Sequence, residues 1–286
     1  MVAGLKRALR KHNAFILSLP ALFWLLVFFI TPLLLVLVLS FMSRDITGRG
    51  TLPFTFEQYE RVFTTFRPVF VSSINIALIS TVVCLLIGYP LAFYIKTRRS
   101  DAVRNLALFL VILPFWTNFL VRTYAWRVIL GQSGPVNTTL LSLGLVDEPV
   151  IFLNTQFAVI VGMVYTFLPF MVLPIYASVE RFDFRQVEAA RDLGANDWHT
   201  FWRVVLPQTM PGVVAGCILV FIPAIGAFIT PDLLGGRDGF MIGNLITRQY
   251  KGTGNVPLGA AASMVLMGAV MLSLLVYIRF TARQER

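Results

Sequence analysis

The sequence predicts an all-α polytopic membrane protein with six transmembrane helices. Three observations carry this prediction. Of the 286 residues, 57% are hydrophobic and 13% are charged, whereas soluble domains carry about 25% charged residues. Six apolar runs are long enough to cross a hydrocarbon core, which takes about 20 residues of helix. The basic residues gather at the ends of these runs, as membrane topology requires.

The six runs follow one another with modest polar connections. Prolines fall inside several of them, which transmembrane helices tolerate because neighbouring groups satisfy the freed carbonyls. The first run is too long for a signal-peptide core and no A-x-A-like site follows it, so we expect an uncleaved first span. The runs are Ala14–Met42, Phe70–Ile95, Leu106–Leu130, Phe157–Ser178, Gly212–Leu233 and Leu258–Phe280.

Charge predicts the orientation of these spans. With the N-terminus in the cytoplasm, the inside segments hold most of the 24 Lys and Arg residues, and the outside segment 131–156 holds none. We therefore expect both termini to be cytoplasmic. The inside basic residues are Lys6, Arg7, Arg10, Lys11, Lys96, Arg98, Arg99, Arg104, Arg181, Arg185, Arg191, Arg203, Arg279, Arg283 and Arg286.

Composition also narrows the function classes. The net charge of +10 does not indicate nucleic-acid binding, because the basic residues form no single stripe or patch. The two cysteines, Cys84 and Cys217, lie inside apolar runs and suggest neither a disulfide nor a metal site. His12 and His199 are too far apart in sequence to suggest a metal or catalytic pair. No cofactor is expected on this chain.

We divide the chain into three parts. Residues 1–68 comprise a cytoplasmic tail, the first transmembrane helix and an external loop. Residues 69–281 form the transmembrane core, which contains a polar cytoplasmic loop at 181–207. Residues 282–286 form a cytoplasmic tail.

The first half of the polar loop predicts a short helix. Asp183 can cap it, with Gln186 three residues later in a capping-box relation. Gly194 suits the left-handed residue that ends a helix. The apolar residues recur every three positions and predict one stripe: Phe184, Val187, Ala190 and Leu193.

The second half predicts another short helix. Asn196 can cap it, Asp197 complements its N-terminal dipole, and Pro207 marks a break before the next span. Trp198, Phe201, Trp202 and Val205 follow at helical spacing as an apolar stripe. From the residues alone, this helix–turn–helix could lie on lipid headgroups or dock in a groove of a soluble partner.

A longer motif runs through the same loop. Glu188-Ala189-Ala190 is followed by three residues, Gly194, nine residues, and then Val204-x-Leu206-Pro207. This pattern resembles the EAA loop, E-A-A-x3-G-x9-I-x-L-P, of the permease subunits of binding-protein-dependent ABC importers. Val204 stands where isoleucine is usual and keeps its β-branched apolar character.

The resemblance implies a type I ABC importer permease whose loop seats in a cleft of an ATP-hydrolysing subunit. Glu188 would make a charged contact there, although a solvated surface charge is the alternative. Ala189 and Ala190 would allow close packing, Gly194 would set the bend, and Leu206 and Pro207 would complete the coupling segment. A phosphate-cradling G-x-x-x-x-G-K-[ST] loop is absent from the sequence. ATP and Mg would therefore be used by the partner.

The likeness extends beyond the loop. The stretches PFWTNFLVRTYAW (Pro114–Trp126), LPFMVLPIYAS (Leu168–Ser178) and IGAFITPDLLGG (Ile225–Gly236) resemble the spermidine/putrescine permeases, a branch of the same family. The branch also carries other small solutes. The resemblance implies import of putrescine or spermidine, with a different small solute as the alternative.

The chemistry of a polyamine agrees with several residues in these stretches. A multiply charged thin cation needs aromatic faces and carboxylates, and a cation over an aromatic ring gains about 0.5–2 kcal/mol. Trp116, Tyr124, Trp126 and Tyr165 could supply faces, or could belong to an interfacial aromatic belt. Asp232, near the outer end of the fifth run, could attract an ammonium group.

The alternative for Asp232 is a wet residue beyond the span, or one paired with Arg122 or Arg127. Two other function classes were weighed for the chain. A stand-alone secondary transporter would be expected to carry charged residues near its span centres, and most of these spans lack them. An embedded enzyme would show a nucleophile–base set or metal spacing, and the sequence suggests none.

The resemblance further implies an assembly in the bacterial inner membrane. Its expected partners are two copies of a cytoplasmic ATP-binding subunit, a second related permease and an extracytoplasmic solute-binding protein, with membrane lipid around them. The chain itself would be a transport subunit and not an enzyme.

Overall fold

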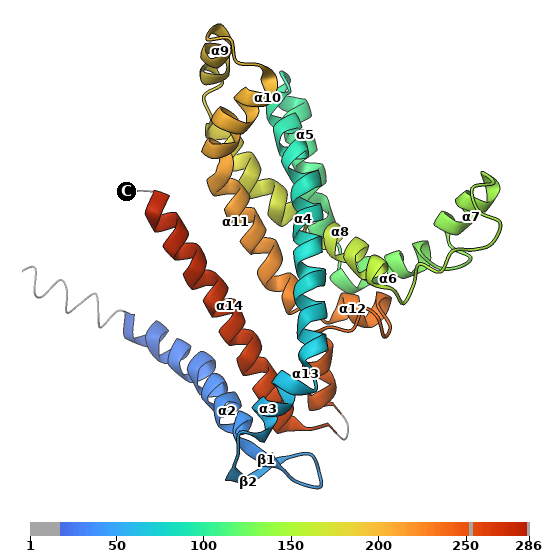
Figure 1. Ribbon diagram of the computed structural model, residues 1–286, viewed down its shortest axis with the longest axis vertical. Coiled ribbons are helices and arrows are strands. Elements are labelled where there is room, and N and C mark those ends of the chain that lie inside the picture. The colour runs from blue at the N-terminus through green and yellow to red at the C-terminus, as the bar shows by residue number, and fades with distance from the viewer. Residues whose placement is uncertain (1–17, 252–253, 285–286) are drawn as a thin grey trace, which may run out of the picture. The chain divides into compact units, whose positions relative to one another are not determined.

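A computed structural model describes residues 18–251 and 254–284 (Figure 1). The basic cluster at Lys6–Lys11, the start of the first run at Ala14 and the terminal Arg286 lie outside the described residues. Within them the chain is helical apart from one short hairpin. Residue contacts divide it into two units. One ends at Thr65 and also takes in Arg248–Gly268, and the other comprises Phe66–Thr247 and the chain from Ala269 onward.

Five described helices are long and apolar enough to cross a membrane, and a sixth span exists where a bent helix pair is counted as one. This agrees with the predicted class of a polytopic helical membrane protein. The five helices are Ser18–Ser40, Arg67–Thr97, Gln156–Arg181, Asp197–Ile225 and Val256–Leu275.

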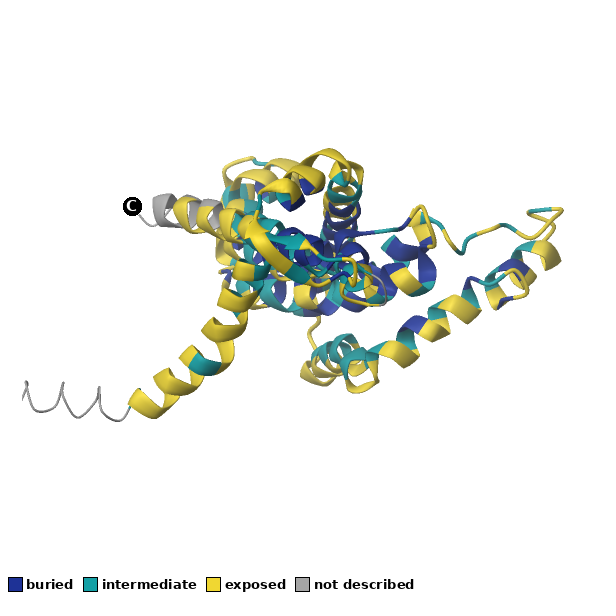
Figure 2. Cartoon of the chain, turned by 90° about the horizontal axis from the view of Figure 1, so that it is seen from below, coloured by how far each residue is buried: buried dark blue, intermediate teal, exposed yellow. Residues whose placement is uncertain are grey.

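The first unit begins with the helix Ser18–Ser40, which contains a π-helical turn η1 (Leu26–Ile30) and continues as α2 (Thr31–Ser40). Its side chains are exposed along nearly the whole length, as the helix next to the grey trace in Figure 2 shows. An apolar helix that buries so little in its own chain needs lipid or another subunit around it.

A hairpin follows this helix, which the all-helical prediction did not include. Strands β1 (Met42–Arg44) and β2 (Gly50–Phe54) pair antiparallel. Asp45 shapes the turn between them, because its carboxylate accepts from the backbone N–H of Ile46 at 2.6 Å and from the hydroxyl of Thr47 at 3.2 Å. Gly48 takes the positive φ of 85° that the turn requires.

The same unit contains α3 (Glu57–Thr64) and the start of α14 (Val256–Gln284). Two buried amides join them: Asn255 Nδ2 donates to Gln58 Oε1 at 3.0 Å. The Asn255 carboxamide also caps α14 by accepting from Leu258 N at 3.1 Å. This pair satisfies polar groups that would be costly to bury alone.

The second unit is built around three packed helices, α4 (Arg67–Thr97), α8 (Gln156–Arg181) and α11 (Leu206–Ile225) (Figure 1). Small residues let α11 approach α8 closely. A Cβ added at Gly212 would meet the Pro174 carbonyl oxygen at 2.5 Å, and one at Gly216 would meet Met171 Sδ at 2.8 Å. This spacing of two glycines four residues apart is typical of membrane helix packing.

The third apolar run is not one straight helix. It forms α5 (Asp101–Ile112), a 3-10 turn η2 (Leu113–Trp116) and α6 (Phe119–Ile129), and the two halves are bent by 96°. Asn118 caps α6 by accepting from Leu120 N at 2.8 Å. The expected continuous span Leu106–Leu130 is therefore wrong, because Pro114 tightens the end of α5 and Asn118 starts a new helix.

The fifth run is also divided. Helix α11 ends at Ile225, and α12 (Ile229–Leu234) follows as a separate short helix. Asn244 of α13 (Ile242–Tyr250) holds this break, since its Nδ2 donates to Phe228 O at 2.9 Å. Between α6 and α8 the connecting segment carries α7 (Pro135–Ser142), where the buried Asn137 donates to Gly131 O and Val150 O.

The predicted break at Pro207 is wrong. The helix runs without interruption from Asp197 to Ile225, through α10 (Asp197–Thr200) and a π-helical turn η3 (Phe201–Val205). Leu206 N donates to Phe201 O, five residues back. The wider turn accommodates a proline, which lacks an N–H and crowds the carbonyl four residues before it. Thr31 donates to Leu26 O before Pro32 in the same way.

Candidate functional site

The cytoplasmic loop predicted at 181–207 forms a helical hairpin. Helix α9 (Arg185–Asp192) ends in two hydrogen bonds: Gly194 N donates to Arg191 O at 2.8 Å and Ala195 N donates to Ala190 O at 3.0 Å. Gly194 has φ of 84°. Together these features form a Schellman motif, which confirms the predicted role of Gly194 as the residue that ends the helix.

The second arm begins as predicted. Asn196 Oδ1 accepts from His199 N at 2.8 Å and caps α10. An ion pair then joins the two arms across the bend, since Arg191 Nη2 and Nε lie 2.8 and 3.0 Å from Asp197 Oδ1. Sequence reasoning used Asp197 only as a dipole partner. Opposite charges flanking a predicted turn were the signal that could have found this pair.

A second link joins the arms at the start of α11. Gln208 Nε2 donates to Gln186 Oε1. The Gln186 side chain is therefore engaged with Gln208, while Asp183 accepts from Arg185 N at 3.0 Å. The expected reciprocal capping box does not form, because the better partner for Gln186 lies on the other arm.

Aromatic contacts seat the hairpin on α4. Phe184 packs against Phe93 with ring centroids 5.9 Å apart, and Phe201 packs edge-on against Tyr89 at 5.6 Å. The Tyr89 hydroxyl lies 2.9 Å from the Thr209 hydroxyl. Movement of the hairpin is thus connected by packed contacts to the core helices α4 and α11.

The two apolar stripes predicted for the hairpin are only partly buried, because some of their side chains are exposed. Leu193 is 90% exposed and does not join Phe184 and Val187. In the second arm Phe201 and Val205 turn inward, whereas Trp198 and Trp202 remain 68% and 49% exposed and contact each other at 5.5 Å. His199 is exposed.

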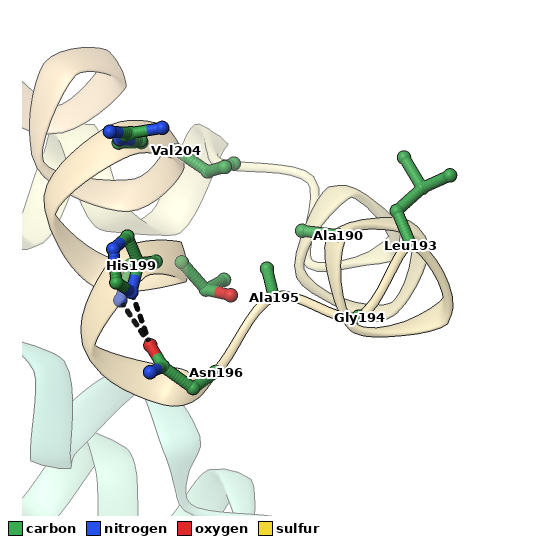
Figure 3. A pocket seen from close by; sticks show the side chains of 9 residues that line it. Ala190, Leu193, Gly194, Ala195, Asn196, His199 and Val204 are labelled. Atoms are coloured by element: carbon green, nitrogen blue, oxygen red, sulfur yellow. Dashed lines mark hydrogen bonds between the residues drawn. The ribbon is translucent and has the colours of Figure 1, made fainter.

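Two hollows lie on the hairpin. One opens toward α4 and includes Phe93, Val187, Glu188 and Phe201 in its lining. The other, which we name the notch, has a volume of about 480 Å³ and lies between α9 and the second arm. Figure 3 shows Ala190 and Ala195 facing the helix that carries His199 and Val204, with Leu193 pointing away. Thr200 and Arg203 also line the notch.

The residues of the EAA-like motif divide between these hollows and the surface. Glu188 lines the hollow toward α4 and is exposed, and Ala189 is exposed beside it. Ala190, Gly194 and Val204 line the notch. Leu206 is partly buried and Pro207 is exposed at the start of α11. The hairpin thus presents the motif to the outside of the chain.

The proposed pathway residues come together only in part. Trp126 of α6 contacts Tyr165 of α8, with ring centroids 5.6 Å apart in an edge-on arrangement. Tyr124 is 53% exposed on α6. Trp116 is 75% exposed at the end of η2 and contacts Phe109 instead. Asp232 is exposed on α12, a helix that packs against both α6 and α8.

Arg122, which the sequence suggested as a possible partner of Asp232, lies in this region. Its Nε and Nη1 atoms are buried and have no hydrogen-bond partner among the described residues. The guanidinium carbon lies 5.8 Å from the ring centroids of Phe115 and Phe119. Within residues 18–251 and 254–284, the ion pairs found do not join Asp232 to Arg122 or to Arg127.

Comparison with known proteins places the fold and the motif in one family. The family model for the binding-protein-dependent transport system inner membrane component matches residues 85–284. The spermidine/putrescine transport system permease protein PotB of Haemophilus influenzae is 45% identical, over 91% of each chain. PotB of Escherichia coli K12 is 44% identical, over 90% of this chain and 93% of its own.

A solved structure agrees at the level of the fold. A bacterial ABC transporter for import of the acidic polysaccharide alginate matches with a TM-score of 0.71 and 20% identity, over 98% of both chains. The chain therefore belongs to the family of binding-protein-dependent transport system inner membrane components.

Proposed function

We propose that this chain is a transmembrane permease subunit of an ATP-driven importer for a polyamine, putrescine or spermidine. One observation carries the substrate class: the chain is 44–45% identical to spermidine/putrescine permeases over about 90% of its length. An alignment of this length with the spermidine/putrescine permeases includes both the α6–α8–α12 region and the coupling hairpin.

The geometry of the α6–α8–α12 region supports a cationic solute. The Trp126–Tyr165 pair offers adjacent aromatic faces and edges, and Tyr124 and Trp116 are exposed nearby in the chain. Asp232 provides an exposed carboxylate on α12. A desolvated ammonium over an aromatic ring gains about 2 kcal/mol, and a carboxylate adds attraction along the path.

A different small solute is the second candidate. The guanidinium of Arg122 favours it, because a half-buried cation without an ion-pair partner among the described residues would repel a polyamine that passed beside it. The solved relative with this fold imports an acidic polysaccharide. Under this alternative the permease role stays the same and only the solute changes.

The importer works with partners. Two cytoplasmic ATP-binding subunits bind and hydrolyse ATP with Mg, a second related permease completes the pathway, and an extracytoplasmic binding protein delivers the solute. The exposed spans support this assembly, since Ser18–Ser40 is 0% buried within its own chain. Both termini lie in the cytoplasm, and this chain does not itself hydrolyse ATP.

The hairpin couples the ATP-binding subunit to the pathway. Glu188 and Ala189 present an exposed edge, and Gly194 fixes the angle between the arms. When the ATP-binding subunits close, they displace the hairpin. The Phe93–Phe184 and Tyr89–Phe201 contacts pass this displacement to α4, and the continuous helix beyond Leu206 and Pro207 passes it to α11. The core then exchanges between two packed arrangements.

Uptake by the complete transporter in proteoliposomes tests the proposal. The assay uses internal ATP and the binding protein, and compares labelled spermidine and putrescine with an amino acid, a sugar and an acidic oligosaccharide. We expect saturable polyamine uptake that requires internal ATP. Saturable, ATP-dependent uptake of another solute would transfer support to the second candidate, and uptake independent of ATP would contradict both.

A further inference from the structure

The notch on the hairpin is lined by a threonine whose buried hydroxyl has no hydrogen-bond partner among the described residues. The Thr200 side chain is 3% exposed, and its Oγ1 atom is buried without a hydrogen-bond partner among the described residues. Several helical threonines elsewhere in the chain bond the carbonyl four residues back, as Thr209 does with Val205 O at 3.0 Å and Thr166 with Gly162 O at 2.8 Å. Thr200 does not, so its hydroxyl is left to an acceptor that the described residues do not supply.

The walls of the notch combine small apolar groups with a free cation. Ala190, Gly194 and Ala195 leave a hollow of about 480 Å³ that Val204 closes on the other arm. Arg203 is exposed at the rim and has no ion-pair partner within the described residues. An occupant must therefore be apolar where it meets the alanines and must carry a hydrogen-bond acceptor where it meets Thr200 and Arg203.

The hairpin is held so that the notch stays open. The Arg191–Asp197 ion pair and the Gln186–Gln208 hydrogen bond join the arms away from Ala195 and Val204. The notch is therefore a receptor surface formed in advance, which lowers the ordering cost of binding.

We propose that the notch receives a protruding apolar side chain of the ATP-hydrolysing subunit, carried beside a carboxylate that binds the Thr200 hydroxyl and the Arg203 guanidinium. The inference rests on the proposed function, because it assumes that such a subunit docks on the hairpin. It goes further by assigning the concave side of the hairpin as a receptor for a side chain of the ATPase.

The first experiment measures how much ATP-hydrolysing subunit copurifies with the permease pair. Ala195→Leu fills the notch and is expected to weaken retention of the ATPase at least tenfold. Thr200→Val removes the hydroxyl at nearly constant volume and should weaken it severalfold, whereas Thr200→Ser keeps the hydroxyl and should retain it. Arg203→Asp should abolish retention. Full retention by both Ala195→Leu and Arg203→Asp would overturn the proposal.

Matched controls lie in exposed positions outside the hairpin. Ala102→Leu, Thr97→Val and Arg99→Asp make the same chemical changes at other exposed sites of the chain and should leave retention unchanged. Loss of ATPase in these controls would mean that the changes act through general instability, and would count against the notch.

A cross-linking experiment identifies the occupant even where a variant folds poorly. A small diazirine-bearing residue at Val204 is irradiated in the complete transporter, and the linked peptide is identified by mass spectrometry. We expect a peptide of the ATP-hydrolysing subunit in which an apolar residue neighbours Asp or Glu. Links only to lipid or to the second permease overturn the inference. Failure of wild-type permease to retain any ATPase would instead overturn the proposed function.

Discussion

The Arg191–Asp197 pair is a residue contact that joins the two arms of the hairpin across the bend at Gly194. Its side chains are 57% and 82% exposed, so in the isolated chain it contributes at most about 1 kcal/mol. The pair matters for the geometry of the hairpin, because it joins the two arms on either side of Gly194, a glycine in the left-handed conformation. A contact that adds little to stability can still decide how a displacement is transmitted.

A charge-swap experiment tests that role. Arg191→Asp alone should leave folding nearly unchanged but lower the solute moved per ATP hydrolysed several-fold, because the arms repel each other. The double variant Arg191→Asp with Asp197→Arg should restore the ratio. Swapping the Asp101–Arg104 pair, at 2.9 Å outside the hairpin, provides the control. If the double variant stays as uncoupled as the single one, the contact is not the positioning element.

Asp232 tests the residue basis of solute choice. Asp232→Asn keeps the size of the side chain and removes its charge, so polyamine uptake should fall about tenfold at low concentration, with normal assembly. The drop corresponds to about 1.4 kcal/mol of lost attraction. Asp147→Asn, at another exposed carboxylate on a segment predicted to be external, should have no effect. Equal uptake by the Asp232→Asn variant and the wild type would make Asp232 a solvated residue outside the path.

At the scale of the element, the bend at Gly194 depends on backbone conformation and not on space. A Cβ at this position would meet no atom within 4 Å, yet φ is 84°. A non-glycine residue in the left-handed region costs about 1–2 kcal/mol, and a β-branched side chain costs more. The hairpin can therefore be altered by strain alone.

Gly194 substitutions should rank by this strain. Gly194→Val should prevent ATPase recruitment or uncouple hydrolysis from uptake, while the permease still inserts in the membrane. Gly194→Asn should retain much of both activities, because asparagine tolerates the left-handed region. Copurified ATPase and uptake are measured for each variant. Normal uptake by the valine variant would exclude a coupling role for the bend.

The elements also mark where sequence reasoning succeeds and fails. Local sequence patterns predicted the ends of the hairpin helices correctly. Gly194 occupies the expected helix-ending position and Asn196 the expected helix-capping position. The break between α5 and α6 was not predicted, because the length and apolar character of the run were given more weight than Pro114 and Asn118. The π-helical turn before Pro207 was missed because a proline signals a break, whereas one extra residue per turn absorbs it.

At the scale of the whole molecule, the class of membrane protein followed from composition because lipid imposes long apolar helices. Side-chain pairings such as Tyr89 with Thr209 could not be predicted, since they join residues far apart in sequence through the packing of α4 and α11. The orientation of the spans stays a prediction from the distribution of charge.

Cysteine labelling tests that orientation. Leu193→Cys and Leu145→Cys place thiols on exposed segments on opposite sides of the predicted topology. A membrane-impermeant maleimide should label position 145 in intact cells, and position 193 only after the inner membrane is opened. Native Cys84 is fully buried and Cys217 is partly buried, which keeps the background low. The reverse labelling would invert the topology.

The bend after α5 has a consequence for the surrounding lipid. Helix α5 and η2 together contain 12 and 4 residues, a rise of about 26 Å, while the 31 residues of α4 rise about 46 Å. Helix α5 has no fully buried side chain in this chain, although Ala107, Leu108 and Val111 pack partly buried against the core. Its length falls short of a hydrocarbon core of about 30 Å, so a bilayer of that thickness would have to thin beside it or be crossed with the help of α6. Lipids with longer acyl chains would increase this mismatch.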